Sequence, residues 1–91
     1  MRKLWSDDSW TEYLAWQAEG PKALERVNAV IRDCERDPFH GIGKPEPLRG
    51  NLSGWWSRRI TSEHRLVYKI SGTGTAQTIE IAQCRSHYSG R

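Results

Sequence analysis

The fold is decided by one run of alternating side chains, His64-Arg65-Leu66-Val67-Tyr68-Lys69-Ile70. Successive side chains of a β-strand point to opposite faces of its sheet, so this pattern predicts a strand with two unlike faces. One face is apolar and can be covered by helices, and it consists of Leu66, Tyr68 and Ile70. The opposite face consists of Arg65, Val67 and Lys69. This arrangement directs Arg65 toward solvent and any ligand.

Two further strands are predicted beside this stretch, at residues 55–60 and 77–85, with turns at 61–63 and 71–74. Residues 39–54 are rich in Gly and Pro and are predicted to be mostly loop. Within this loop Pro45 and Pro47 flank Glu46 and remove two backbone donors, so the segment is at most an edge strand or an extended loop. A stiff segment of this kind can hold the Glu46 carboxylate in a fixed position.

The N-terminal half carries signals for a short strand followed by two helices. Lys3-Leu4-Trp5 is the predicted strand, and Ser6 is a suitable N-cap for a helix that stops at Gly20. Pro21 can open the second helix, which Pro38 ends. The second helix has an apolar stripe formed by Leu24, Val27, Val30, Ile31 and Cys34. The two helices are predicted to form an antiparallel hairpin.

The composition predicts one globular domain spanning residues 1–91, with 36% hydrophobic and 27% charged residues. The net charge is +3, and the basic excess is concentrated from Lys44 onward. This bias favours a polyanionic partner, although a solvated charged face is the alternative. Trp10 and Trp16 fall on different sides of the first helix, so one of them is expected to be exposed and to suggest an interface.

The cysteines, Cys34 and Cys84, lack metal-type spacing and are expected to be buried thiols, one on the helix stripe and one in a strand. His40 and His64 also lack other ligands at metal spacing and are interpreted as non-catalytic. No segment has the apolar length of a membrane span, and no apolar leader follows Met1. We therefore expect a cytoplasmic protein without metal, cofactor or membrane partner.

The chain also contains the side chains that metal-independent RNA cleavage requires. That reaction needs a base for the 2′ proton, cations for the phosphorane and an acid for the leaving 5′ oxygen. Glu46, the arginines and His87 match these roles, and Tyr88 could stack on a base, orient it or hold the phosphate. Arg58 and Arg59 point to opposite faces of one strand, so at most one of them lines a site. Each residue alone is more often an inert surface group.

Several motifs strengthen this interpretation together. They are Pro38-Phe39, Gly43-Lys44-Pro45-Glu46-Pro47-Leu48, Asn51-Leu52-Ser53-Gly54, Trp56-Ser57-Arg58-Arg59-Ile60-Thr61, Glu63-His64-Arg65-Leu66-Val67-Tyr68, Cys84-Arg85 and His87-Tyr88. With them the chain resembles the YoeB toxins, in the RelE-like group of bacterial toxin–antitoxin ribonucleases. The resemblance runs from Trp5 through Tyr88. It implies an α+β fold of two N-terminal helices packed on a small antiparallel sheet, as in other microbial-ribonuclease-like RelE toxins.

The resemblance also implies roles for individual residues. By position, Glu46 resembles the general base, His87 the general acid, Arg65 the phosphate stabiliser and Tyr88 a substrate-positioning residue. Lys44, Arg49 and Arg59 resemble substrate-binding residues. Arg49 stands where the family pattern has Lys, which keeps the charge but changes the geometry.

The activity implied is that of a type II toxin, a metal-independent endoribonuclease that cleaves mRNA in the ribosomal A site and inhibits translation. Its products would carry a 2′,3′-cyclic phosphate and a 5′-hydroxyl. The implied partners are a YefM-like antitoxin, mRNA, the ribosome (the 30S A site and both subunits) and a second toxin copy in a homodimer.

The alternative is a non-catalytic protein of the same fold, either a topoisomerase-directed toxin or an RNA-binding module, because fold alone does not fix function. The presence of Glu46, Arg65 and His87 together favours the enzyme, since a pure binding protein has no use for that set.

Overall fold

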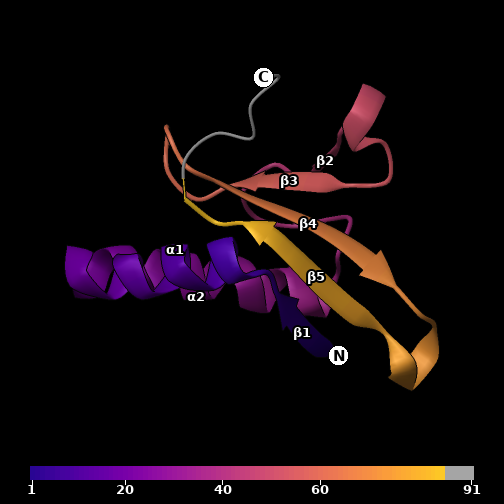
Figure 1. The fold of residues 1–91 in the computed structure, drawn as a ribbon, viewed down its shortest axis with the longest axis horizontal. Coiled ribbons are helices and arrows are strands. Elements are labelled where there is room, and N and C mark those ends of the chain that lie inside the picture. The colour runs from indigo at the N-terminus through magenta and orange to yellow at the C-terminus, as the bar shows by residue number, and fades with distance from the viewer. Residues whose placement is uncertain (86–91) are drawn as a thin grey trace.

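The computed structural model describes residues 1–85 of the chain, and Figure 1 shows two helices on one side of a five-stranded sheet. The elements in chain order are β1 (Arg2–Trp5), α1 (Asp7–Glu19), α2 (Pro21–Arg36), β2 (Glu46–Pro47), β3 (Trp56–Arg59), β4 (Arg65–Ser71) and β5 (Thr78–Gln83). Short 3-10 helices at Gly50–Leu52 and Gly74–Ala76 interrupt two of the connections. The predicted α+β class is confirmed.

The strands lie in the order β1-β5-β4-β3-β2. The pairs β2–β3, β3–β4 and β4–β5 are antiparallel, whereas β1 runs parallel to β5. The expectation of a wholly antiparallel sheet is therefore wrong at one edge. The physical reason is connectivity, because a hairpin can join only antiparallel strands, whereas β1 and β5 are separated by almost the entire chain.

The core lies between the helix hairpin and the apolar face of the sheet. It combines the α2 stripe with strand residues, namely Val27, Val30, Ile31, Cys34, Leu66, Tyr68, Ile79 and Ile81, together with Trp16, Ile60 and Cys84. Leu66 and Tyr68 are fully buried, which confirms the predicted apolar face of β4. On the other face of β4, Val67 is also buried, at the centre of the sheet between Ser57 and Gln83. Burying each large apolar side chain contributes about 1.5–3 kcal/mol.

The helix boundaries follow the local signals in the sequence. The Ser6 hydroxyl accepts a hydrogen bond from the Ser9 backbone N–H at 3.0 Å and so caps α1. Gly20, at φ 117°, separates the helices, and Pro21 is the first residue of α2. Trp16 is 2% exposed and Trp10 is 45% exposed, so the predicted division of the two tryptophans is confirmed.

The last strand ends earlier than predicted. Cys84, expected within it, follows β5 because the N–H groups of Cys84 and Arg85 both donate to the Glu12 carboxylate on α1, at 2.8 and 3.2 Å. Both thiols are buried and form no disulfide, as predicted.

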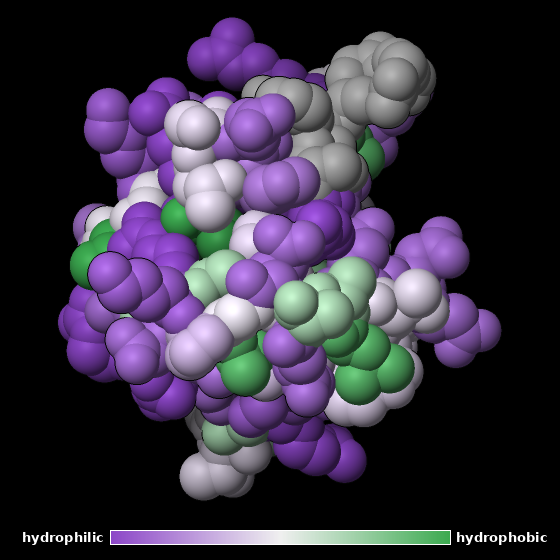
Figure 2. Space-filling model, turned by 90° about the vertical axis from the view of Figure 1, so that its left-hand side faces the viewer, coloured by the Kyte–Doolittle hydropathy of each residue, from purple (hydrophilic) through white to green (hydrophobic). Residues whose placement is uncertain are grey.

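The surface carries a few large apolar side chains: Met1, Leu4, Trp10, Leu14, Phe39 and Ile42 are each at least one-third exposed. Figure 2 shows one face of the molecule, where green apolar atoms form small separate patches in a mainly hydrophilic surface. Within residues 1–85, neither helix is both long and apolar enough to cross a membrane.

Candidate active site

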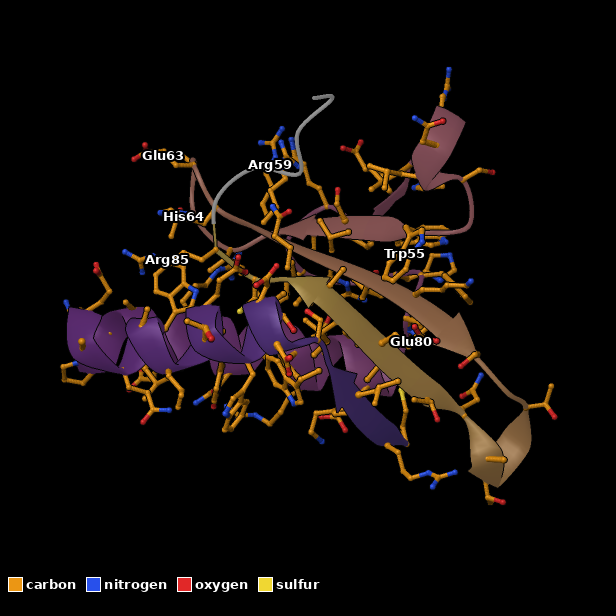
Figure 3. The ribbon with its side chains drawn as sticks, in the orientation of Figure 1. Trp55, Arg59, Glu63, His64, Glu80 and Arg85 are labelled. Carbon is orange, nitrogen blue, oxygen red and sulfur yellow. The ribbon has the colours of Figure 1, made fainter. Side chains whose placement is uncertain are left out.

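The candidate site lies on the sheet face that the helices leave open. Side chains of directly paired residues point to the same face of a sheet. Glu46 is paired with Ser57, and Arg59 is paired with Arg65, across three neighbouring strands. Since Arg58 points into the core, these four residues share the opposite face. Figure 3 shows Arg59 extending away from α1 and α2.

The structure brings Glu46 and Arg65 into contact. Oε1 of Glu46 lies 3.7 Å from Nη1 of Arg65, and their side chains are 55% and 20% exposed. A pair with one half-exposed partner and this long a separation contributes at most about 1 kcal/mol to stability. Its significance is therefore chemical: it places a carboxylate beside a guanidinium on the sheet face opposite the helices.

Arg59 places a second guanidinium on this face. Its backbone N–H donates to the Gly43 carbonyl at 2.6 Å, and its own carbonyl accepts from Nη2 of Arg26 at 3.3 Å, while the side chain is exposed. Two cations directly opposite each other on neighbouring strands repel. A bound anion between Arg59 and Arg65 would relieve that repulsion, so this part of the face favours a phosphate group.

Lys44 and Arg49 flank β2, two residues before Glu46 and two after Pro47, and both are exposed. Lys44 has φ 52°, a left-handed conformation that is uncommon for a residue with a side chain. The loop therefore turns sharply just before Pro45, and the chain is extended when it reaches Glu46.

Arg58 is the residue whose importance the sequence did not reveal. Arg58 and Arg59 point to opposite faces of β3, as predicted, and Arg58 is fully buried rather than merely turned away. Its Nη1 lies 2.7 Å from Oδ2 of Asp33 on α2, and its Nε donates to the Tyr68 hydroxyl at 3.2 Å. Because β3 also contains Ser57 and Arg59, nothing in the sequence distinguishes this buried arginine from a surface one.

The charges around Asp33 shift its acidity. Hydrogen bonds from Arg36 and Arg58, together with one from the Ile42 N–H, hold the pKa of Asp33 far below its ordinary range. Burial alone would lower the pKa of Arg58, but its hydrogen bonds to Tyr68 and Asp33 outweigh that effect and raise it. Asp33 and Arg58 are thus both charged at neutral pH.

Side chains of α1 fix the backbone just before the two remaining candidates. Nε1 of Trp16 donates to the Cys84 carbonyl at 2.7 Å, and the Arg85 guanidinium lies 4.9 Å from the Trp16 ring centre. Arg85 also pairs with Glu19 at 2.9 Å. Figure 3 shows Arg85 and His64 near α1, where the His64 ring meets Trp16 edge-on at 5.1 Å. The predicted catalytic residues His87 and Tyr88 lie outside the described residues.

Among residues 1–85, no group of three or more His, Cys, Asp and Glu side chains is arranged to hold a metal ion.

In sequence and in structure the chain is similar to known bacterial toxins. The family described as YoeB-like toxin of bacterial type II toxin-antitoxin system matches residues 5–88. Toxin YoeB of Escherichia coli (strain K12) is 51% identical over 88 residues, which cover 97% of this chain and 100% of that protein.

Two solved structures are also similar. A YoeB/ParE toxin from Agrobacterium tumefaciens has a TM-score of 0.92 and 50% identity, covering 97% of this chain and 100% of that one. YoeB from Staphylococcus aureus has a TM-score of 0.83 and 36% identity, covering 97% and 98%, and has been solved both as a dimer and in a heterotetrameric YoeB-YefM complex. The chain therefore belongs to the YoeB-like toxins of bacterial type II toxin–antitoxin systems.

Proposed function

We propose that this toxin is a metal-independent endoribonuclease that cleaves mRNA in the ribosomal A site of the bacterial cytoplasm and so stops translation. The observation that carries the proposal is the contact between Glu46 and Arg65 on the sheet face opposite the helices, with Arg59 beside them. A carboxylate next to two guanidiniums provides a base and a phosphate clamp at one place.

The attacking group is the 2′-hydroxyl of the RNA itself. Glu46 accepts its proton as the oxygen attacks the adjacent phosphorus. Arg65 and Arg59 stabilise the extra negative charge of the phosphorane, in which five oxygens crowd the phosphorus. The bond to the 5′ oxygen then breaks, and His87 donates the proton that this oxygen needs. The products are a 2′,3′-cyclic phosphate and a 5′-hydroxyl, and no atom is gained from water.

The remaining candidates bind rather than transform the RNA. Lys44 and Arg49 are exposed on both sides of β2 and can contact neighbouring phosphates. Tyr88 positions the substrate at the cut site. Placement in the A site, through contacts with the 30S and the other subunit, brings the mRNA to these groups.

The partner proposed for control of this activity is a YefM-like antitoxin. The support is the YoeB-YefM complex of the Staphylococcus aureus relative. A toxin homodimer is proposed on the same ground, since that relative also forms a YoeB dimer. The exposed Trp10 and Leu14 lie one turn apart on α1 and supply an apolar patch of the kind that interfaces cover.

The test is cleavage of a defined mRNA on purified ribosomes, mapped by primer extension with and without EDTA once ribosome integrity is verified. The wild type should cut at the A site, and Glu46→Gln and His87→Gln should each lose about a hundred- to ten-thousand-fold in rate while remaining folded and antitoxin-bound. A toxin that binds antitoxin and stops growth but leaves mRNA intact would overturn the proposal in favour of a non-catalytic binding protein.

A further inference from the structure

We infer that Asp33 and Arg58 are positioning residues for Glu46: their ion pair fixes the loop of residues 37–45, and that loop determines the position of the Glu46 carboxylate. This inference rests on the proposed function, in which Glu46 is the general base. It concerns residues that lie beneath the sheet and touch no substrate.

Arg58 connects the catalytic face to the loop by its place in β3. It lies between Ser57, which is paired with Glu46, and Arg59, which is paired with Arg65. Its own side chain points to the opposite side and is fully buried. There the guanidinium hydrogen-bonds three loop carbonyls: Nη1 donates to Ile42 at 3.1 Å, and Nη2 donates to Asp37 and, at 3.1 Å, to His40.

Asp33 binds the same loop from α2. Its Oδ2 accepts from the Ile42 N–H at 2.9 Å as well as from Arg58. The approach is so close that a Cβ added at Gly41 would lie 1.9 Å from this oxygen. Tyr68 completes the set, since its hydroxyl donates to the Pro38 carbonyl. The loop is therefore folded directly around a part-buried carboxylate and a buried guanidinium.

Apolar burial contributes less to the shape of this loop. Its two large apolar residues, Phe39 and Ile42, are each 40% exposed. The Phe39 ring contacts Trp56 at 4.8 Å, but most of the named attachments are the polar ones above. The geometry of the loop consequently depends on Asp33 and Arg58 more than on core packing.

The connection from the loop to Glu46 is short and stiff. The Gly43 carbonyl accepts from the Arg59 N–H at 2.6 Å, Lys44 has φ 52°, and Pro45 and Pro47 have restricted φ on both sides of Glu46. A displacement of residues 37–43 is therefore transmitted along the backbone to Glu46. It moves the Glu46 carboxylate relative to Arg65, and a misplacement of about 1 Å can reduce a rate about a hundredfold.

The experiment compares Asp33→Asn and Tyr68→Phe with the matched control Glu35→Gln. The control neutralises a carboxylate on the same helix that pairs with Lys3 at 3.0 Å on the surface, away from the site. Single-turnover cleavage on programmed ribosomes gives a maximal rate and a half-saturating toxin concentration for each variant. Circular dichroism at the assay temperature confirms folding. These two variants avoid relying on Arg58→Met, which removes a buried charge and can prevent folding.

We expect Asp33→Asn to lower the maximal rate about ten- to a hundredfold, with unchanged half-saturation and antitoxin affinity, and Glu35→Gln to match the wild type. Asp33→Asn introduced into the Glu46→Gln variant should lower the cleavage rate little further, because the carboxylate that it would misplace is already absent. A folded Asp33→Asn protein that cleaves at the wild-type rate, or an equal loss in both backgrounds, would overturn the inference. Failure of the proposed function is distinguishable, because the wild type itself would then not cleave.

Discussion

Glu46 and Arg65 meet across an intervening strand: Oε1 of Glu46 on β2 lies 3.7 Å from Nη1 of Arg65 on β4, with β3 between them. The contact depends on two strand registers at once, Glu46 opposite Ser57 and Arg59 opposite Arg65. A one-residue slip in either register would turn one partner into the core. The fold thus specifies the pair before any substrate is present.

Arg65→Lys should reduce cleavage although it keeps the charge. A lysine ammonium cannot make the two parallel hydrogen bonds that a guanidinium makes to phosphate. Losing one charge-assisted hydrogen bond corresponds to about 1.5–3 kcal/mol, or about ten- to a hundredfold in rate. Cleavage on programmed ribosomes measures the effect, and Lys69→Arg on the same strand is the control. Equal rates for Arg65→Lys and the wild type would exclude a bidentate phosphate contact.

An mRNA with a 2′-deoxy nucleotide at the cut site should resist cleavage. The proposed nucleophile is the 2′-hydroxyl, so its removal eliminates the attacking atom and leaves Glu46 without a proton to accept. The matched control carries the same modification one nucleotide downstream and should be cut normally. Cleavage of the first substrate at the control rate would show that another nucleophile acts, and the role of Glu46 as base would be wrong.

Gly43→Ala should destabilise the protein by about 1–3 kcal/mol through backbone strain. Gly43 has φ 81°, and an added Cβ would lie 2.6 Å from the Arg59 carbonyl oxygen. Gly50→Ala is the control, because Gly50 also has a positive φ of 64° but no atom within 4 Å of the added carbon. Urea unfolding of both variants gives their free energies of unfolding, and the difference separates the steric clash at Gly43 from the cost of a positive φ alone. Equal losses would mean that the close approach to Arg59 is not retained in solution.

The local features of the fold follow from the sequence, whereas its long-range features do not. Ser6, Pro21 and the alternation of residues 64–70 each act on their own neighbours, so they identify a cap, a helix start and a strand face. The parallel β1–β5 pair and the end of β5 depend on distant partners, such as Glu12 for Cys84. Glu46 and Arg65 were identifiable as candidates, but their contact requires the registers of three strands. The sequence predicts that Arg58 lies on the opposite strand face from Arg59, but not that it is buried, because its burial arises from a loop and a helix that surround it.

Stability should fall in acid partly through Asp33. Its pKa is lowered in the folded protein by hydrogen bonds from Arg36 and Arg58, while an unfolded aspartate has a pKa near 3.9. The unfolded state therefore binds the proton more readily, so the contribution of Asp33 is complete above about pH 4 and is lost progressively as the pH falls toward the folded pKa. Urea midpoints measured from pH 7 to pH 2.5 should decline less steeply below pH 4 for Asp33→Asn than for the wild type. Parallel curves for the two proteins would contradict this linkage.

Cys84 should report whether α1 holds the segment that leads to His87. Burial raises the pKa of Cys34 to about 11 and that of Cys84 to about 12, and the reactive form of a thiol is the thiolate. At pH 8 the native protein should therefore react with a disulfide reagent only when it opens, and both thiols should react in urea.

Trp16→Phe removes the indole N–H that binds the Cys84 carbonyl and should release this segment locally. Cys84 should then label faster than Cys34, a difference that single-cysteine variants made with Cys34→Ala and Cys84→Ala can assign. Cleavage should fall in parallel, since the proposed acid lies three residues beyond Cys84 in the chain. If both thiols instead label at one common rate, set by global unfolding, then α1 supports the C-terminal segment only through the stability of the whole domain.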